Sequence, residues 1–260
     1  MRVPDSAQAL ISRALRSATF RSAFGSLTLP VSIVTLRRAR RSVLTPQDAA
    51  DLVFGRRFAW LVAPWQDRQE LIGTLEALAL ERPRTILEIG TCRGGALMTY
   101  AHFAQDDATI VSIDLPRGRF GGGYPAWRTP LYRSFGRAAQ RIELVRGDSH
   151  AAATRATVER SLAGRSVDFL FIDGDHTYEG VRSDFELYSP LLSGRALVGF
   201  HDIVAGGSEE VGGVPDFWRE LKGTGRYPVR EIVGDWEAGS GGIGLVSVGG
   251  RPLAPADREP

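Results

Sequence analysis

Short apolar segments alternate with longer amphipathic segments along most of the chain. The apolar runs occupy residues 85–90, 108–114, 141–147, 167–173 and 196–202, and two more follow at 229–235 and 242–248. Short, mostly apolar runs of this length are typical of strands that are buried on both faces of a sheet. Because helical spacing fills the stretches between them, the pattern predicts an α/β fold with a Rossmann-like, doubly wound, mostly parallel sheet of seven strands.

The residues before this region have a different pattern. Apolar residues recur at helical spacing over 5–24, 46–54 and 66–81, and Thr45 followed by Pro46 is typical of a helix start. These segments predict an N-terminal helical extension over residues 1–82, ahead of a main domain at 83–250. The proline-rich residues 251–260 are expected to form a tail.

The composition is that of a globular protein in a reducing compartment. Of the 260 residues, 43% are hydrophobic and 24% are charged, and Cys92 is the only cysteine in the sequence. A single cysteine excludes an intrachain disulfide. No apolar run approaches the roughly 20 residues of a membrane-spanning helix, so we expect a cytoplasmic protein without a membrane span.

Positive charge is concentrated near the N-terminus. Residues 1–43 contain eight arginines and a single acidic residue, Asp5. Such a segment could bind nucleic acid or an anionic membrane surface. The alternative, favoured by the apolar residues between the arginines, is a set of helices whose arginines face water and whose apolar side packs on the main domain or on a second subunit. We therefore expect no nucleic-acid partner, and a homo-oligomer stays open.

Polar residues stand at the ends of five predicted strands. In chain order they are Glu88 with Gly90, Asp114, Asp148 with Ser149, Asp173, and His201 with Asp202. In open α/β sheets, ligands bind beyond the carboxyl ends of the strands. These residues therefore predict a binding site along one edge of the sheet.

The first strand end continues into a glycine-rich turn, "LEIGTCRGG" at residues 87–95. The residues of this turn are Gly90, Thr91, Cys92, Arg93 and Gly94. Glycines let backbone N–H groups approach a ligand, and the N-terminus of the following helix adds partial positive charge. Cys92 stands where a nicotinamide-binding fingerprint has its second glycine, so that cofactor class is not favoured.

The acids beyond this turn suit an adenosine that carries a positive charge. Glu88 is unexpected beside a pyrophosphate but suits an ammonium or sulfonium group. Asp114, on the next strand, can accept hydrogen bonds from both ribose hydroxyls, and Asp148 lies within reach of an adenine amino group.

Four segments in this order resemble class I S-adenosylmethionine-dependent methyltransferases: "ILEIGTCRGG", "VSIDLP", "VRGDSH", and "FIDGDHTYEGVRSDFELYSPLL" with the later "FHD". Over about residues 60–248 the chain is similar to the bacterial family related to antibiotic sugar O-methyltransferases and to the so-called cephalosporin hydroxylases. The resemblance implies that S-adenosylmethionine binds with Glu88 and Gly90 at its methionine half, Asp114 at the ribose, and Asp148 with Ser149 at the adenine.

The last two strand ends predict a metal site. Asp173 and Asp202 follow strands expected to be neighbours, and adjacent parallel strands lie about 4.8 Å apart. Asp173 is also expected beside the methyl donor. Together with His201, the two carboxylates suit a divalent cation such as Mg²⁺ or Mn²⁺. The resemblance also implies a metal here, although His201 stands where some relatives have an acid, which makes a softer metal conceivable.

His176, three residues after Asp173, has the spacing at which certain relatives carry their proposed general base. A neutral imidazole can take a hydroxyl proton near pH 7. The alternative is a structural histidine that caps the following helix or bonds to Asp175.

Residues 117–130, "RGRFGGGYPAWRTP", combine three consecutive glycines with Tyr124 and Trp127. A flexible, aromatic loop suits a lid over donor and acceptor, with its rings stacking on a sugar or another ring. A purely structural loop is the alternative.

Taken together, these features predict an S-adenosylmethionine-dependent O-methyltransferase. Its acceptor would be a hydroxyl of a small sugar-like or natural-product molecule, with assistance from a divalent metal. Two alternatives stay open: a metal-dependent hydroxylase-type enzyme, and a non-catalytic protein that binds S-adenosylmethionine.

Overall fold

The structure, a computed structural model, describes residues 18–118, 120, 122–137, 139–206, 211–237 and 240–253, with side chains from residue 28 onward. Among these residues, seven strands form one sheet in the order β3-β2-β1-β4-β5-β7-β6. Neighbouring strands from β3 to β5 are parallel, whereas β7 runs antiparallel to both β5 and β6. The predicted mostly parallel, seven-stranded α/β fold is confirmed.

The strands match the apolar runs of the sequence to within a few residues. They are β1 (Thr85–Ile89), β2 (Thr109–Asp114), β3 (Arg141–Arg146), β4 (Val167–Ile172), β5 (Leu192–His201), β6 (Val229–Ile232) and β7 (Ile243–Ser247). Because β1 lies between β2 and β4, the chain reverses its winding direction at β1. Parallel sheets of this kind leave a crevice at that point, beyond the carboxyl ends of the strands.

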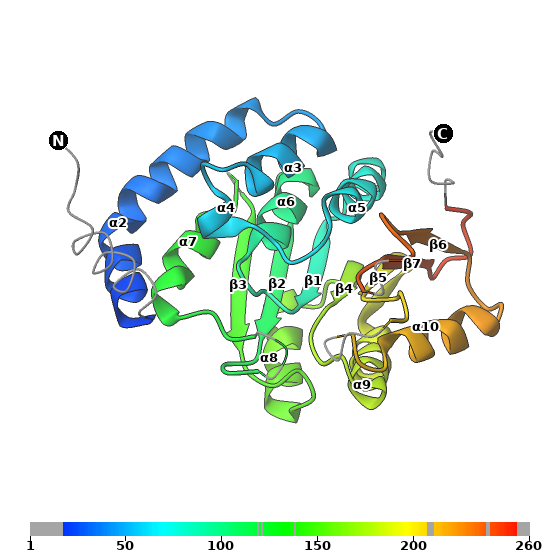
Figure 1. Ribbon diagram of the computed structural model, residues 1–260. Coiled ribbons are helices and arrows are strands. Elements are labelled where there is room, and N and C mark those ends of the chain that lie inside the picture. Colours follow the sequence, from blue (N-terminus) through cyan, green and yellow to red (C-terminus); the bar gives the residue numbers. More distant parts are fainter. Residues whose placement is uncertain are drawn as a thin grey trace.

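Helices cover both faces of the sheet (Figure 1). On one side lie α2 (Ala18–Ala39), α3 (Pro46–Phe54), α4 (Ala59–Val62), α5 (Arg68–Glu81), α6 (Gly95–Phe103) and α7 (Thr129–Arg133), and on the other α8 (Ala152–Leu162), α9 (Tyr178–Tyr188) and α10 (Val214–Gly223). Short 3₁₀ helices follow α2 and α9 and precede α7: η1 (Arg40–Ser42), η3 (Ser189–Leu191) and η2 (Ala126–Arg128).

Successive residues of the central strands enter two different hydrophobic cores. Ile86 and Ile110 belong to the core under α3, α5 and α6, whereas the next residues, Leu87 and Val111, belong to the core under α8, α9 and α10. Side chains alternate between the faces of a strand, so a sheet covered on both faces needs apolar residues at every position. This is why the strands appear in the sequence as continuous apolar runs.

The helices before β1 share the first of these cores with the sheet. Leu71 and Leu75 of α5 are fully buried in the same cluster as Ile86 of β1. Helix α5 begins with a capping box, in which Asp67 accepts a hydrogen bond from the start of the helix and Glu70 accepts one from the backbone N–H of Asp67. Helix α5 therefore holds its first turn in a fixed position beside the sheet.

The arginine-rich segment is only partly described, since residues 1–17 lie outside the described ranges. Helix α2 extends from Ala18 to Ala39, well beyond the predicted helix at 5–24. The expectation that the arginines of this N-terminal segment face water is wrong for Arg40 of η1. This residue is 8% exposed and donates from Nη1 to the carbonyl of Phe135 at 2.6 Å. Burial, with two nearby arginines, lowers the pKa of Arg40 to about 10. This buried hydrogen bond joins η1 to the segment after α7.

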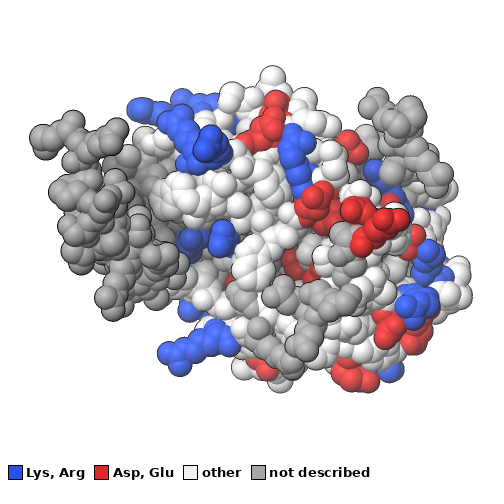
Figure 2. Space-filling view, viewed as in Figure 1, with Lys and Arg blue, Asp and Glu red and all other residues white. Residues whose placement is uncertain are grey.

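Charge is unevenly spread over the surface. On the face drawn in Figure 2, acidic side chains gather right of centre, whereas the upper left carries basic side chains. No helix of the described residues is both long and apolar enough to cross a membrane.

Candidate active site

A cavity of about 1360 Å³ opens at the carboxyl ends of the parallel strands. Most of the residues singled out from the sequence line it: Gly90, Thr91, Cys92, Arg93, Gly94, Asp114, Asp148, Ser149, Asp173, His176, His201 and Asp202. Ligand pockets are commonly about 300–1,000 Å³. This cavity is therefore large enough to hold two ligands side by side.

The strand register brings the polar strand ends together. Ile89 of β1 is paired with Ile113 of β2 and with Ile172 of β4, and Ile172 is paired with Phe200 of β5. The residues that follow these four positions are Gly90, Asp114, Asp173 and His201. One register therefore aligns four predicted site residues along the edge of the sheet.

Gly90 occupies a position that admits no side chain. Its φ is +101°, and a Cβ atom there would lie 1.9 Å from the carbonyl oxygen of Asp173. Gly94, with φ +76°, is the N-cap residue of α6. A Cβ atom on Gly94 would lie 2.7 Å from the ring of Tyr132. The glycines thus bring the turn close to β4 and to α7, and Cys92 between them also has a positive φ, of 45°.

Asp114 is held by the glycine turn and by the loop after β2. Its Oδ2 accepts a hydrogen bond from the backbone N–H of Cys92 at 2.9 Å, and its Oδ1 accepts one from the backbone N–H of Gly123. Burial raises the pKa of Asp114. A carboxylate oxygen has two lone pairs, so each oxygen can accept a further hydrogen bond from a ligand in the cavity.

Glu88, expected at the methionine half of the ligand, is not among the residues that line the cavity. It is fully buried in β1, where Ser112 donates a hydrogen bond to its Oε2, while its Oε1 has no hydrogen-bond partner. Burial raises the pKa of Glu88 to about 8. The hydroxyl of Ser112 also lies 2.5 Å from that of Thr91, so Glu88 supports the glycine turn from behind.

His150, which lines the cavity just after β3, forms an ion pair that could not be predicted from the sequence. Nε2 of His150 lies 3.2 Å from Oδ1 of Asp184, a fully buried residue of α9. The nearby carboxylate of Asp184 raises the pKa of His150 to about 9, and Nε2 of His150 also lies 3.2 Å from the carbonyl oxygen of Gly180. The hydroxyl of Tyr188 donates to the carbonyl of Ser149 at 2.8 Å. Helix α9 therefore anchors the loop after β3, which carries Asp148 and Ser149.

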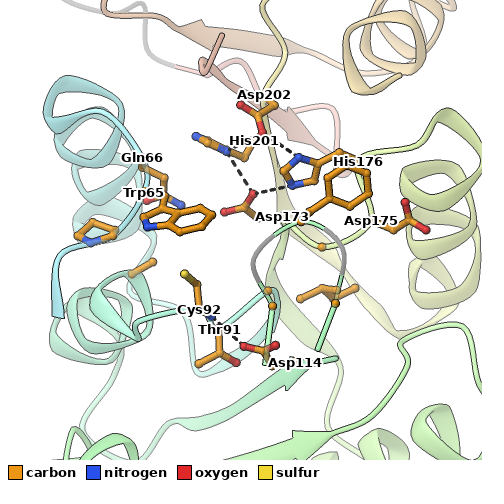
Figure 3. Close-up of a pocket in the computed structure, with 18 of the residues that line it drawn as sticks. Trp65, Gln66, Thr91, Cys92, Asp114, Asp173, Asp175, His176, His201 and Asp202 are labelled. Carbon is orange, nitrogen blue, oxygen red and sulfur yellow. Dashed lines mark hydrogen bonds and ion pairs between the residues drawn. The ribbon is translucent and has the colours of Figure 1, made fainter. Parts of the chain in front are cut away.

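Two acids and two histidines meet at the ends of β4 and β5 (Figure 3). Nδ1 of His201 lies 3.2 Å from Oδ1 of Asp173 and 3.4 Å from Oδ2 of Asp202. Ligand atoms of these three residues lie within 4.8 Å of one another. Asp202 has a φ of +62°, which is uncommon for a residue other than glycine, and its Oδ1 accepts a hydrogen bond from the backbone N–H of Gly241. Strained backbone of this kind concentrates at functional sites.

Burial and charge oppose each other in this cluster. Burial alone would raise the pKa of Asp173, but His201 and His176 hold that pKa well below its usual range. Burial alone would lower the pKa of His201, but the nearby carboxylates, Asp173 foremost, raise it well above its usual range. The cluster is therefore a set of mutually stabilising charges.

His176 contacts both acids of this cluster. Its Nε2 lies 3.4 Å from Oδ1 of Asp173 and its Nδ1 lies 3.2 Å from Oδ2 of Asp202. The backbone N–H of Gly213 donates to its carbonyl at 2.7 Å, and the ring of Phe120 stacks on its imidazole at 4.7 Å. Asp175, the alternative partner of His176, points away from the cluster in Figure 3 and accepts from the backbone N–H of Thr177.

The aromatic residues of the loop after β2 differ from the prediction. Tyr124 is 4% exposed, packs against Tyr132 and does not line the cavity, and neither does Trp127. The loop contributes Phe120 instead. The sequence of this loop does not reveal which aromatic ring points into the cavity, because that depends on the packing of Tyr124 against Tyr132 of α7.

Segments outside the motifs supply the remaining wall. Trp65, Gln66 and Glu70 line the cavity ahead of β1, and Gly234 with Asp235 line it after β6. Glu70 also reaches His201, whose Nε2 lies 3.4 Å from Oε2 of Glu70. This contact could not be predicted, since the two residues are far apart in the chain and Glu70 has the spacing of an ordinary helix cap.

Sequence comparisons find similarity over part of this chain. A family model described as a methyltransferase domain matches residues 87–203. An uncharacterized protein of Sinorhizobium fredii, y4gI, is 33% identical over 143 residues, which make up 54% of this chain and 15% of that much longer protein.

Solved structures with the same fold include three methyltransferases. The O-methyltransferase TomG of Streptomyces achromogenes, in complex with S-adenosylmethionine, superposes with a TM-score of 0.51 at 20% identity and covers 77% of this chain and 87% of its own. The O-methyltransferase of Bacillus cereus, in complex with S-adenosylhomocysteine, gives 0.54 at 17% identity, covering 82% and 97%.

The TDP-rhamnose 3′-O-methyltransferase CalS11 of calicheamicin biosynthesis gives a TM-score of 0.51 at 22% identity and covers 85% of this chain and 94% of its own. At such identities the structures establish the common fold. Residues 87–203 therefore match a methyltransferase domain, and the chain shares the fold of these solved methyltransferases.

Proposed function

We propose that the protein transfers the methyl group of S-adenosylmethionine to a hydroxyl of a small acceptor, with a divalent metal at Asp173, His201 and Asp202. The observation that carries this proposal is the position of Asp173. Its backbone lies against Gly90 of the glycine turn, and its carboxylate belongs to the metal cluster. A donor on the turn and an acceptor on the cluster would therefore meet at this residue.

The donor half of the cavity fits S-adenosylmethionine by the shape of the turn. The cofactor supplies an electrophilic methyl group. Gly90 and Gly94 let the turn pack closely against Asp173 and Tyr132 while it lines the cavity, and Asp114 keeps lone pairs for ribose hydroxyls. Asp148 and Ser149 line the same cavity at the end of β3, where the adenine would lie. Glu88 acts through Ser112 and Thr91 and does not touch the ligand.

The acceptor half fits a divalent cation by its donor set. Nδ1 of His201 is buried without a hydrogen bond and faces two carboxylates. A bound cation lowers the pKa of an oxygen acid that binds to it. His176 would take the acceptor proton at Nε2, while its Nδ1 stays against Asp202. Phe120, stacked on the ring of His176, would shield this proton transfer from water.

The charge of the cavity favours a neutral or cationic acceptor. Arg93 is the one arginine or lysine among the described residues that line it, and it belongs to the glycine turn. Acidic residues, among them Asp67 and Asp235, line the wall opposite the donor half. A sugar nucleotide, such as the TDP-rhamnose named for CalS11, carries a diphosphate that acidic walls repel. We therefore propose an acceptor without a diphosphate.

A second candidate, the hydroxylase-type reaction, is favoured by one observation. Nε2 of His176 and Nδ1 of His201 both lie within 3.4 Å of Oδ1 of Asp173. Two histidines and one carboxylate form the facial triad of non-haem iron oxygenases. Mass spectrometry separates the candidates, because methylation adds 14 mass units to a metabolite and hydroxylation adds 16.

Calorimetric titration tests the donor site directly. The protein should bind S-adenosylhomocysteine, and Asp114→Ala should weaken binding by about 1–3 kcal/mol, the usual cost of leaving polar groups without partners. Asp106→Ala removes an exposed acid whose side chain is 77% accessible and serves as the control. Unchanged binding in Asp114→Ala would refute the ribose assignment.

The transfer reaction itself is tested on cell extracts. Extracts compared with and without the gene should differ by a methyl group in at least one small molecule.

A further inference from the structure

His201 lies between carboxylates on both sides of its ring. On one side Nδ1 faces Asp173 and Asp202, and on the other Nε2 faces Glu70. Both nitrogens are buried and neither makes an aligned hydrogen bond. The Nδ1 edge of the imidazole therefore points to the cluster of Asp173 and Asp202, and the Nε2 edge points to Glu70, a carboxylate that is not part of that cluster.

The distances between Nδ1 of His201 and the two carboxylate oxygens suit ligands of one shared metal ion. Metal ligands at about 2.0–2.2 Å from an ion, in tetrahedral or octahedral arrangement, lie roughly 3.0–3.5 Å from one another. Nδ1 of His201 lies 3.2 Å from the Asp173 oxygen and 3.4 Å from the Asp202 oxygen. The two contacts therefore have the distances of neighbouring ligands.

Glu70 is fixed independently of His201. It is 3% exposed, its Oε2 accepts from the backbone N–H of Asp67 at 3.1 Å, and its Oε1 accepts from that of Gly242 at 2.5 Å. These partners belong to the start of α5 and to the loop before β7. The carboxylate is therefore held in place before any ligand arrives.

A histidine that binds a metal through one nitrogen commonly donates the other N–H to a carboxylate, which fixes the tautomer and the ring orientation. We propose that Glu70 is the positioning residue for His201: it keeps the proton on Nε2, directs the Nδ1 lone pair at the cluster, and so makes the site select a first-row transition metal over Mg²⁺. Imidazole is a ligand of zinc, iron, copper and nickel, whereas Mg²⁺ favours oxygen. The inference rests on the metal site of the proposed function.

Cobalt(II) alone is the probe, because its visible absorption reports the ligands around it. The full-length wild type should bind Co²⁺ at least 100-fold more tightly than Mg²⁺ in calorimetric titrations. Glu70→Gln keeps an oxygen for one backbone N–H but removes the charge, and it should weaken Co²⁺ binding about 10–100-fold. Glu76→Gln is the matched control, since Glu76 is on the same helix with a side chain that is 44% exposed, and its Co²⁺ affinity should equal that of the wild type.

A measurement on the wild type covers the case in which Glu70→Gln does not fold. In the Zn²⁺-loaded protein, long-range ¹H–¹⁵N spectra should show His201 protonated at Nε2 and metal-bound at Nδ1. Metal bound at Nε2, equal affinity for Co²⁺ and Mg²⁺, or a folded Glu70→Gln protein with unchanged Co²⁺ affinity would each overturn the inference. Methyl transfer is measured separately: a protein that binds Co²⁺ as described but transfers no methyl group would support the inference and refute the proposed function.

Discussion

The ion pair between His150 and Asp184 should make stability depend on pH, and Asp184→Asn removes it. Asp184 is fully buried, and its Oδ1 lies 3.2 Å from Nε2 of His150. The carboxylate of Asp184 raises the pKa of His150 from 6.5 to about 9. The shift amounts to an upper limit of about 3 kcal/mol, at 1.36 kcal/mol for each pKa unit. Since the His150 side chain is 31% exposed, screening by water reduces this to about 1–2 kcal/mol.

The sign follows from the direction of the shift. The folded state binds a proton more tightly than the unfolded state does, so the contribution is complete below pH 6.5 and is lost as pH rises through about 9. In the wild type, the free energy of unfolding should therefore fall over this interval by about 1–2 kcal/mol from His150. In Asp184→Asn most of this fall should disappear, and the contacts of His150 with Asp148, at 3.8 Å, and with the carbonyl oxygen of Gly180, at 3.2 Å, should remain.

Urea unfolding at pH 6, 7, 8 and 9.5, followed by circular dichroism, measures this difference. Asp184→Asn changes a buried side chain and so affects stability at every pH; the comparison therefore uses the slope of the unfolding free energy with pH and not its absolute value. Glu186→Gln, on the same helix, removes an exposed acid paired with Arg182 and should keep the wild-type slope. Parallel curves for the wild type and Asp184→Asn would show that His150 titrates without help from Asp184.

Three further changes test the site and its supports. Glu88→Gln should flatten the pH profile between about pH 4.5 and 8, because burial raises the Glu88 pKa to about 8 and the wild type loses stability as pH rises over that range; identical profiles in urea unfolding would contradict this. Gly90→Ala should cost at least about 2 kcal/mol more than Gly164→Ala, since both glycines have positive φ but only Gly90 lacks space for a Cβ, and equal losses in urea unfolding would refute the steric argument. Arg40→Met should lower the melting temperature and Arg38→Met should not, because only Arg40 is buried.

The sheet and the gathering of polar strand ends at one cavity were predictable because their causes are local. The central strands are mostly apolar, with exceptions such as Glu88, and polar residues mark where they end, as at Asp114 and Asp173. Strand register then places these residues together without further information. The positions of Gly90 and Gly94 were predictable for the same reason, since a turn between a strand and a helix needs a backbone that only glycine adopts easily.

The supports of the site were not predictable because they depend on contacts between distant segments. Glu70 has the sequence signature of a helix cap and fulfils that role, and nothing in its neighbours indicates that its second oxygen approaches His201. Asp184 lies on a helix with many charged residues, and its complete burial beside His150 arises from the packing of α9 on the sheet. Phe120 lines the cavity whereas Tyr124 does not, and this is decided by how the loop folds back onto Asp114.

The cavity is assembled from two kinds of chain segment, one inside the family match and one outside it. The match covers residues 87–203 and contains the glycine turn and the cluster of Asp173, His201 and Asp202. The opposite wall, with Trp65 and Glu70 on one side and Asp235 on the other, comes from segments before and after that match. An exchange of these outer segments between related chains would reshape one wall and leave the other intact. Under the proposed function, recombination at the two flanks would change the acceptor preference without a mutation in the sheet that would hold the donor.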